Sequence, residues 1–204
     1  MKSFYKKNKK NLLTFALLKI LAKSIKMNFI QRHFAKKYIA ENKKVRIPEV
    51  VSLRDAKNVG ILCNITTEDT YKDIYAVFSK LQNSTRSVWL VGYIDGKAIP
   101  FYCLQQLSAD YFCNKDLNWF GKPTKGQVQT FCETEFDVLL DFSHEVFDPL
   151  RFIMAITPAK FIIGSEKRNA DLYDLLIQSN EELSNMELLK NITHYTNQLS
   201  GKQS

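Results

Sequence analysis

Glycine and proline are scarce in this sequence, with seven Gly and five Pro among 204 residues. This scarcity excludes a collagen-like chain and a flexible linker protein. Long apolar runs are missing as well. The run Leu12–Leu18 is apolar except for Thr14, whereas a helix needs about 20 apolar residues to cross a bilayer. Lys19 and Lys23 follow closely and no small-x-small cleavage motif stands out, so we expect neither a signal peptide nor a spanning helix.

Acidic residues are nearly absent from the first 46 positions, where Glu41 is the only one beside fourteen Lys and Arg residues. This segment carries a net charge of +13, and because the whole chain carries +8, the remaining residues carry −5. A basic segment on an acidic body attracts polyanions in a salt-dependent way. The charge distribution therefore predicts an anionic macromolecule as the partner, and it says nothing about the fold.

The chain is also poor in the residues that build metal and redox sites. It has three histidines and four cysteines, and the cysteines form no C-x-x-C pair: Cys63, Cys103, Cys113 and Cys132. Three of the four lie inside apolar or aromatic runs. That pattern favours reduced, buried thiols in a cytoplasmic protein over disulfides or zinc ligation. We predict no metal site.

A helix is predicted over residues 11–40, where Pro and Gly are absent and Leu, Ala, Lys and Ile dominate. Three lysines within it follow i, i+4, i+7 spacing and share one face: Lys19, Lys23 and Lys26. Pro48 marks a break. We therefore divide the chain into a basic amphipathic helical arm, residues 1–47, and a single α/β domain, residues 48–204.

Three interpretations of the arm remain open. Its apolar side can dock on the body, it can lie in the plane of a membrane surface, or its lysines can neutralise the phosphates of RNA. RNA is favoured, because basic residues extend beyond the apolar helix at both ends, with aromatic residues among them. The residues predicted to contact nucleic acid or membrane are Lys6, Lys7, Lys9, Lys10, Lys19, Lys23, Lys26, Arg32, Lys36, Lys37, Lys43, Lys44 and Arg46.

The body alternates between apolar runs and amphipathic segments. Strands are predicted at Val59–Ile65, Ser87–Ile94, Phe136–Phe142 and Lys160–Ile163, with an edge strand at Asp171–Gln178. Helices are predicted at Glu68–Leu81, Thr124–Cys132, Pro149–Ile156 and Asn180–Leu199. Pro100–Leu107 is interpreted as a further strand or hairpin, and Ser108–Pro123 as an irregular excursion. This alternation predicts the α/β class: a Rossmann-like sandwich with a mostly parallel sheet, preceded by the basic N-terminal helical arm.

Ligands of open parallel sheets bind beyond the carboxyl ends of the strands. After the first predicted strand, residues 65–70 contain no glycine, and Glu68 and Asp69 occupy the first helical turn with Thr67 as its N-cap. Two carboxylates at a helix N-terminus repel a pyrophosphate. We therefore predict no dinucleotide and no other cofactor.

One cluster has catalytic potential: Asp141, His144 and Glu145, at the end of a predicted strand. Neighbours in sequence do not make a catalytic geometry, and no other histidine lies in a segment predicted to form core. We interpret His144 first as a surface or cap residue and second as a functional group, so an enzyme is disfavoured but not excluded. The aromatic turn Trp119–Pro123 is interpreted as a loop pinned to the core or, alternatively, as a contact surface for a partner.

The runs VGILCNI, KDLNWFGKP, FDVLLDFS, AKFIIGS and DLYDLLIQ resemble an uncharacterised bacterial family known only as a domain of unknown function. This resemblance covers roughly residues 55–200, behind a basic helix, and implies no activity. FDVLLDFS followed by PLRFIMAITPAKFIIG is similar to the N-terminal Rossmann half of heptosyltransferase-type glycosyltransferases, which implies the fold. It does not imply their activity, because those enzymes bind the sugar nucleotide mainly through a second Rossmann domain, for which 204 residues leave no room.

Together these features predict a cytoplasmic, non-enzymatic α/β binding module. Its arm is expected to engage RNA or the ribosome in preference to an anionic membrane surface. One alternative is a peripheral membrane protein that uses the arm as an in-plane amphipathic helix. The other is a small glycosyltransferase-like or hydrolytic enzyme that uses Asp141, His144 and Glu145.

Overall fold

The structure is a computed structural model that describes residues 29–82, 85–104, 106–143, 148–165, 170–179 and 183–201. The part of the predicted arm before residue 29 lies outside the described residues, and so do His144 and Glu145.

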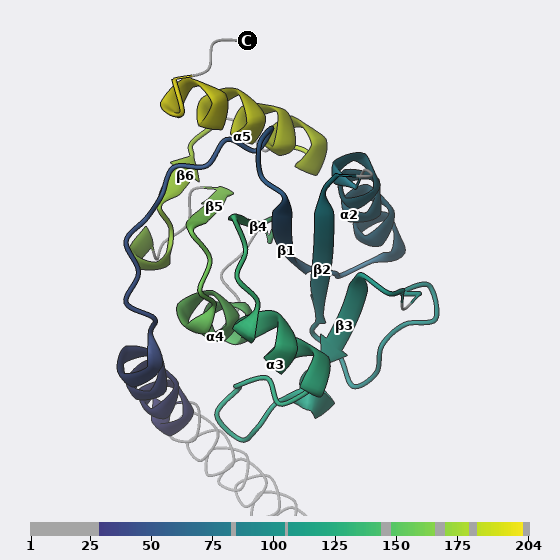
Figure 1. Cartoon of the computed structure of the whole chain (residues 1–204). Coiled ribbons are helices and arrows are strands. Elements are labelled where there is room, and N and C mark those ends of the chain that lie inside the picture. The colour runs from purple at the N-terminus through teal and green to yellow at the C-terminus, as the bar shows by residue number, and fades with distance from the viewer. Residues whose placement is uncertain are drawn as a thin grey trace, which may run out of the picture.

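Six parallel strands form one sheet in the order β3-β2-β1-β4-β5-β6 (Figure 1). The strands are β1 (Asn58–Asn64), β2 (Ser87–Ile94), β3 (Ala109–Cys113), β4 (Val138–Asp141), β5 (Phe161–Ser165) and β6 (Leu175–Ile177). Ile61 of β1 lies opposite Leu90 of β2 and Leu140 of β4, so β1 is central. The predicted Rossmann-like α/β fold is confirmed, and the strand order reverses beside β1.

Helices cover both faces of the sheet. They are α2 (Glu68–Leu81), α3 (Gly126–Glu133), α4 (Asp148–Ile156) and α5 (Asn185–Leu199), with short 3-10 turns η1 (Asn114–Asp116) and η2 (Ala170–Leu172). α2 and α5 pack together on one face, and α3 and α4 on the other. The Thr67 hydroxyl accepts a hydrogen bond from the first turn of α2, which confirms the predicted N-cap. Ser184 and Glu187 form a capping box at the start of α5.

Strands β1 to β5 contribute alternate residues to two hydrophobic cores, because successive side chains of a strand point to opposite faces. In β1, Ile61 and Cys63 point toward α2 and α5, while Leu62 points toward α3 and α4. All three are buried. Burial on both faces explains why the central strands are continuous apolar runs in the sequence.

The prediction of an irregular excursion at Ser108–Pro123 is wrong in part. This segment contains the edge strand β3, which runs parallel to β2. Phe112 of this strand enters the core under α3 and α4. Asp110 interrupts the apolar pattern in the sequence, but it accepts a hydrogen bond from Trp89 Nε1 at 2.9 Å and is buried. The strand or hairpin predicted at Pro100–Leu107 is also wrong: its described residues form turns, with a single isolated bridge from Gln106 to Ala109.

Two further segments precede β1. The described chain begins with a helix over residues 29–42, here called the N-terminal helix, and continues as an extended strap over residues 43–52. Figure 1 shows the helix beside α4 and the strap running past β5 and β6 to α5. The strap is fixed by backbone hydrogen bonds, from Lys44 N to Ala155 O at 2.9 Å and from Glu49 N to Lys160 O at 3.1 Å. Among the helices described, none is long and apolar enough to cross a membrane.

Candidate functional site

The N-terminal helix has an inner side that packs on the body. Ala35 is only 7% exposed, and Ile39 packs against the core under α3 and α4. The ring of Tyr38 lies 5.8 Å from that of Phe152 in α4 and 5.9 Å from that of Phe120, measured between centroids. The docking interpretation is therefore confirmed for the described part of the arm. Apolar burial and aromatic contacts hold this helix against the domain.

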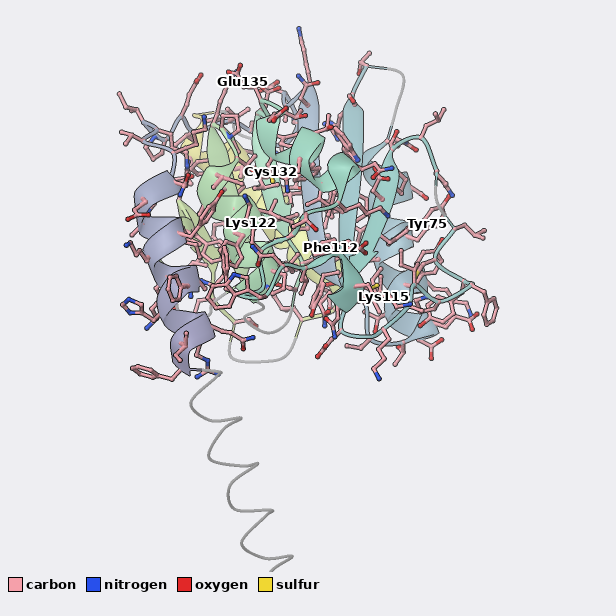
Figure 2. All side chains as sticks on the ribbon, turned by 90° about the horizontal axis from the view of Figure 1, so that it is seen from below. Tyr75, Phe112, Lys115, Lys122, Cys132 and Glu135 are labelled. Carbon is pink, nitrogen blue, oxygen red and sulfur yellow. The ribbon has the colours of Figure 1, made fainter. Side chains whose placement is uncertain are left out.

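The N-terminal helix packs on the turn Trp119–Pro123. Lys122 Nζ lies 4.4 Å from the centroid of the Tyr38 ring and donates a hydrogen bond to the Tyr38 hydroxyl at 2.6 Å. Figure 2 shows Lys122 on the side of the body that faces the helix. Gln31 Nε2 donates to the carbonyl oxygen of Trp119 at 2.7 Å. The turn is thus pinned by its aromatic residues, as predicted, and what it contacts is the chain's own N-terminal helix.

A partly buried ion pair anchors the strap. Arg46 Nη1 lies 2.6 Å from Asp174 Oδ2, and Nη2 lies 3.0 Å from Oδ1, so the pair is bidentate. The side chains are 19% and 9% exposed. Asp174 Oδ2 also accepts a hydrogen bond from Ile162 N at 2.7 Å, which ties the pair to β5. Arg46 was predicted to contact an external polyanion, but its guanidinium is bound within the protein.

The outer side of the N-terminal helix and the start of the strap carry the exposed basic residues. These are Arg32, Lys36, Lys37, Lys43 and Lys44. Arg32 and Lys36 form no hydrogen bond or ion pair with any residue that the structure describes. Lys37 lies 3.8 Å from Glu41, with both side chains about 60% exposed, and such surface pairs contribute little. Lys43 Nζ donates to the Asp171 carbonyl oxygen at 2.9 Å. Figure 2 shows side chains projecting from this helix away from the body.

The remaining predicted contact residues belong to the part of the arm that the structure does not describe. They are Lys6, Lys7, Lys9, Lys10, Lys19, Lys23 and Lys26. Their roles stay predictions.

Asp141, at the carboxyl end of β4, belongs to a buried hydrogen-bond cluster. Its Oδ1 accepts from Ser143 N at 2.8 Å and from Ser143 Oγ at 2.6 Å, and its Oδ2 accepts from the Tyr173 hydroxyl at 2.5 Å. Asp141 is 1% exposed and Ser143 is 2% exposed. His144 and Glu145, the other two members of the predicted cluster, lie outside the described residues.

The sequence analysis did not identify Tyr173 as a member of this cluster. Gly164 is the residue in the sequence that could have indicated it. A Cβ atom on Gly164 would lie 2.6 Å from Tyr173 Cε1, so only glycine lets this ring lie over β5 and reach Asp141. Burial, followed by the negative charge of Asp141, raises the pKa of Tyr173 far above its ordinary value. Tyr173 therefore remains a hydrogen-bond donor at every physiological pH. The cluster joins the end of β4 to the segment that precedes β6, across Gly164 of β5.

The four cysteines are free and buried, as predicted. Burial raises the pKa of Cys103 to about 11 and that of Cys132 to about 12, and it raises the pKa of Cys63 further still. These three thiols are therefore protonated at neutral pH and poor nucleophiles. Within the described ranges, no group of three His, Cys, Asp or Glu side chains is placed to hold a metal ion.

The all-parallel sheet, its strand order and its helices on both faces define a Rossmann-like α/β protein. The chain belongs to the family of unknown function DUF6913, whose model matches residues 26–199. The match begins before the described N-terminal helix and continues to the end of α5, so the helix and strap are part of the family's domain. No curated protein matches the chain, and no solved structure does. The similarity to heptosyltransferase-type enzymes stays a prediction, as does the division of the chain at residue 47.

Proposed function

We propose that this protein is a non-enzymatic binding module that presents the outer side of its N-terminal helix to structured RNA, such as that of the ribosome. The observation that carries the proposal is that one side of the helix packs on the domain while the other side exposes basic residues to solvent. Its inner side is anchored through Ala35 and Tyr38, while Arg32 and Lys36 extend into solvent without partners among the described residues. An anchored helix presents its charges in a fixed geometry, which lowers the entropy cost of binding.

Charge and aromatic exposure support RNA as the partner. The first 46 residues carry +13, and Lys and Arg side chains that neutralise phosphates release counterions. Phe29 is 74% exposed and Trp119 is 54% exposed, beside the basic residues of the helix. Exposed aromatic rings next to cations are the elements on which unpaired RNA bases stack.

The docked inner side argues against the membrane alternative for this part of the arm. An in-plane amphipathic helix inserts its apolar side between lipid headgroups. Here Ala35, Tyr38 and Ile39 face the body, so their apolar surface is unavailable to a bilayer. What this helix offers to a partner is its cationic residues, together with the exposed rings of Phe29 and Phe34.

The state of Asp141 supports a role other than catalysis. Each of its carboxylate oxygens accepts a hydrogen bond from Ser143 or Tyr173, and the side chain is buried. A general base needs an oxygen within reach of substrate. Asp141 instead ties the end of β4 to the segment that precedes β6.

The proposal is tested by sucrose-gradient fractionation of the tagged full-length protein beside a membrane pellet. A variant with Arg32→Glu and Lys36→Glu is compared with a control that has Lys97→Glu and Lys115→Glu, also at exposed lysines. Both variants lower the net charge from +8 to +4. We expect salt-sensitive co-migration with ribosomes for the wild type and the control, and a clear loss for the helix variant. Recovery in the membrane pellet, or equal behaviour of both variants, contradicts the proposal.

A further inference from the structure

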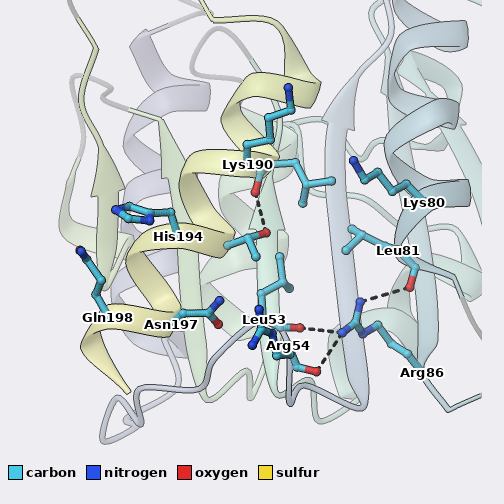
Figure 3. Close-up of a pocket in the computed structure, with 11 residues that line it drawn as sticks. Leu53, Arg54, Lys80, Leu81, Arg86, Lys190, His194, Asn197 and Gln198 are labelled. Atoms are coloured by element: carbon cyan, nitrogen blue, oxygen red, sulfur yellow. Dashed lines mark hydrogen bonds between the residues drawn. The ribbon is translucent and has the colours of Figure 1, made fainter. Parts of the chain in front are cut away.

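A cavity of about 730 Å³ lies on the opposite face of the sheet from the N-terminal helix, between α2 and α5 (Figure 3). It opens where β1 and β2 begin, since Leu53 and Arg54 precede β1 and Arg86 directly precedes β2. Cavities of roughly 300–1,000 Å³ are typical of small-molecule sites. This cavity therefore has the size of a binding site, and it lies at the amino ends of β1 and β2, opposite the end at which the sequence predicts ligands to bind.

The lining of the cavity is strongly basic. Its basic members come from the loop before β1, from α2, from the start of β2 and from α5: Arg54, Lys80, Arg86, Lys190 and His194. No acidic side chain lines the cavity within the described part of the chain. Figure 3 shows Lys80 extending from α2 toward α5. The acid nearest to Lys190 along α5 is Glu187, whose carboxylate accepts hydrogen bonds from Ser184 at the helix N-terminus.

Arg86 is a fixed positive charge in this lining. Its Nη2 donates to the carbonyl oxygen of Leu53 at 2.7 Å, its Nε to that of Ala56 at 3.0 Å, and its Nη1 to that of Leu81 at 3.3 Å. All three acceptors are neutral, so they orient the guanidinium without cancelling its charge. Burial lowers the pKa of Arg86, yet an arginine keeps its proton in proteins. Arg54 and Lys80 likewise form no ion pair with described residues.

The cavity also offers apolar surface and one buried amide. Leu53, Leu81 and Leu189 contribute the apolar part of the lining. Asn197 is 6% exposed, and its Oδ1 accepts a hydrogen bond from Ser52 Oγ at 2.5 Å. Its Nδ2 donates to no residue that the structure describes. A small number of polar groups on an apolar wall is what fixes the orientation of a ligand.

We infer that this cavity binds a small phosphorylated ligand of about the size of a nucleoside phosphate. A phosphate group suits Arg54, Lys80 and Lys190, because no acidic side chain lines the cavity beside them; Lys190 interacts with Glu187 only outside the lining. The leucines accommodate the organic part of the ligand, and Asn197 Nδ2 supplies a directional donor. This site is separate from the outer side of the N-terminal helix, and it adds a second binding function to the proposed RNA binding.

The test uses the full chain and three probes: pyrophosphate, ADP and glucose 6-phosphate. Binding is measured by isothermal titration calorimetry and by the shift in melting temperature. The cavity variant carries Lys80→Glu and Lys190→Glu, both exposed residues that are not needed for the core. The control carries Lys97→Glu and Lys115→Glu, with the same change of charge. Arg32→Glu with Lys36→Glu tests whether the helix binds the probes instead.

We expect at least one probe to bind, with affinity reduced about tenfold or more in the cavity variant and within about twofold of wild type in both others. Failure of all three probes to bind more tightly than about 1 mM overturns the inference. Equal loss in the control also overturns it, because binding would then follow net charge alone. If RNA displaces the probe, or the cavity variant loses RNA binding, the cavity is part of an RNA surface and the inference fails.

Discussion

The two sides of the N-terminal helix and strap differ in what their basic residues contact. On the inner side, the Arg46 guanidinium is bound by Asp174, and Tyr38 is packed against Lys122 of the body. On the outer side, Arg32 and Lys36 are exposed and contact no described residue through a hydrogen bond or an ion pair. Basic residues that are close together in sequence thus either stabilise the fold or remain exposed to solvent.

This difference shows that a charge count does not separate structural from functional basic residues. Arg46 contributes to the +13 of the first 46 residues as much as Arg32 does. Its charge is nevertheless neutralised inside the molecule, so it adds little to the field that an external polyanion meets. We accordingly assign polyanion binding to the exposed set and not to Arg46.

The largest expected effect on stability comes from removing the ion pair between Arg46 and Asp174 on the inner side. Asp174→Ala leaves the mostly buried Arg46 guanidinium without its carboxylate and removes the acceptor of Ile162 N. Because the pair is only partly buried, we expect a loss of about 2–3 kcal/mol in the free energy of unfolding. Urea denaturation measures it. Glu41→Ala, which removes an exposed pair, is the control and should change stability by less than about 0.5 kcal/mol. Similar effects of the two substitutions would show that Arg46 is not an anchor.

A smaller effect is expected at the aromatic contact. Tyr38→Ala removes ring contacts to Phe120 and Phe152 and should cost about 2 kcal/mol, because Tyr38 is only half-buried. Hydrogen exchange of residues 29–42 should accelerate, and affinity for RNA should fall although no charge is removed. The exposed Phe29, changed to Ala, serves as control for stability. Unchanged exchange in Tyr38→Ala would mean that the helix is not held by its inner side.

Much of the sheet could be predicted because its signals are local. The strand Ser87–Ile94 and the helix Glu68–Leu81 were predicted with the bounds that they have, from an apolar run and from the Thr67 cap. β3 could not be predicted in the same way. Its Asp110 is polar in the sequence, and its burial depends on Trp89 in the neighbouring strand.

The anchoring residues could not be predicted, because their partners are distant in sequence. Asp174 is 128 positions from Arg46, and Lys122 is 84 positions from Tyr38. Tyr173 was missed for a similar reason, since its contact with Asp141 spans 32 positions. Patterns of charge and hydrophobicity show where basic and aromatic residues occur in the sequence. Which of them form contacts inside the protein is determined only by the folded structure.

A pH-dependent effect is expected next to the strap. Desolvation of Asp137 is outweighed by hydrogen bonds from Lys160 Nζ and from the backbone of Asn58 and Lys57, which lower the pKa of its carboxyl below 3.8. A lowered folded-state pKa means that the stabilisation is present above the unfolded-state value and is lost as the pH falls through the folded-state value. The difference in stability between wild type and Asp137→Asn should therefore be constant near neutral pH and disappear as the pH falls through the lowered folded-state pKa of Asp137. Acid titrations of both proteins in urea check this, and a difference that grows toward low pH would contradict it.

The smallest effect on stability is expected on the outer side. Arg32→Glu with Lys36→Glu removes no hydrogen bond or ion pair to a described residue, so the free energy of unfolding should change by less than about 0.5 kcal/mol. Urea denaturation of this variant beside Asp174→Ala measures the contrast between the two sides directly. A loss of several kcal/mol would mean that the outer residues also serve the fold.

The most direct measurement for the proposed function is the salt dependence of binding to a fluorescent structured RNA, between about 50 and 200 mM salt. For the wild type we expect affinity to fall steeply with salt. In Arg32→Glu with Lys36→Glu, the slope of log affinity against log salt should decrease by about 1.5, because two phosphate contacts are lost. The Lys97→Glu, Lys115→Glu control should keep the wild-type slope. Binding that is insensitive to salt, or a slope that is the same in all three proteins, would contradict the account.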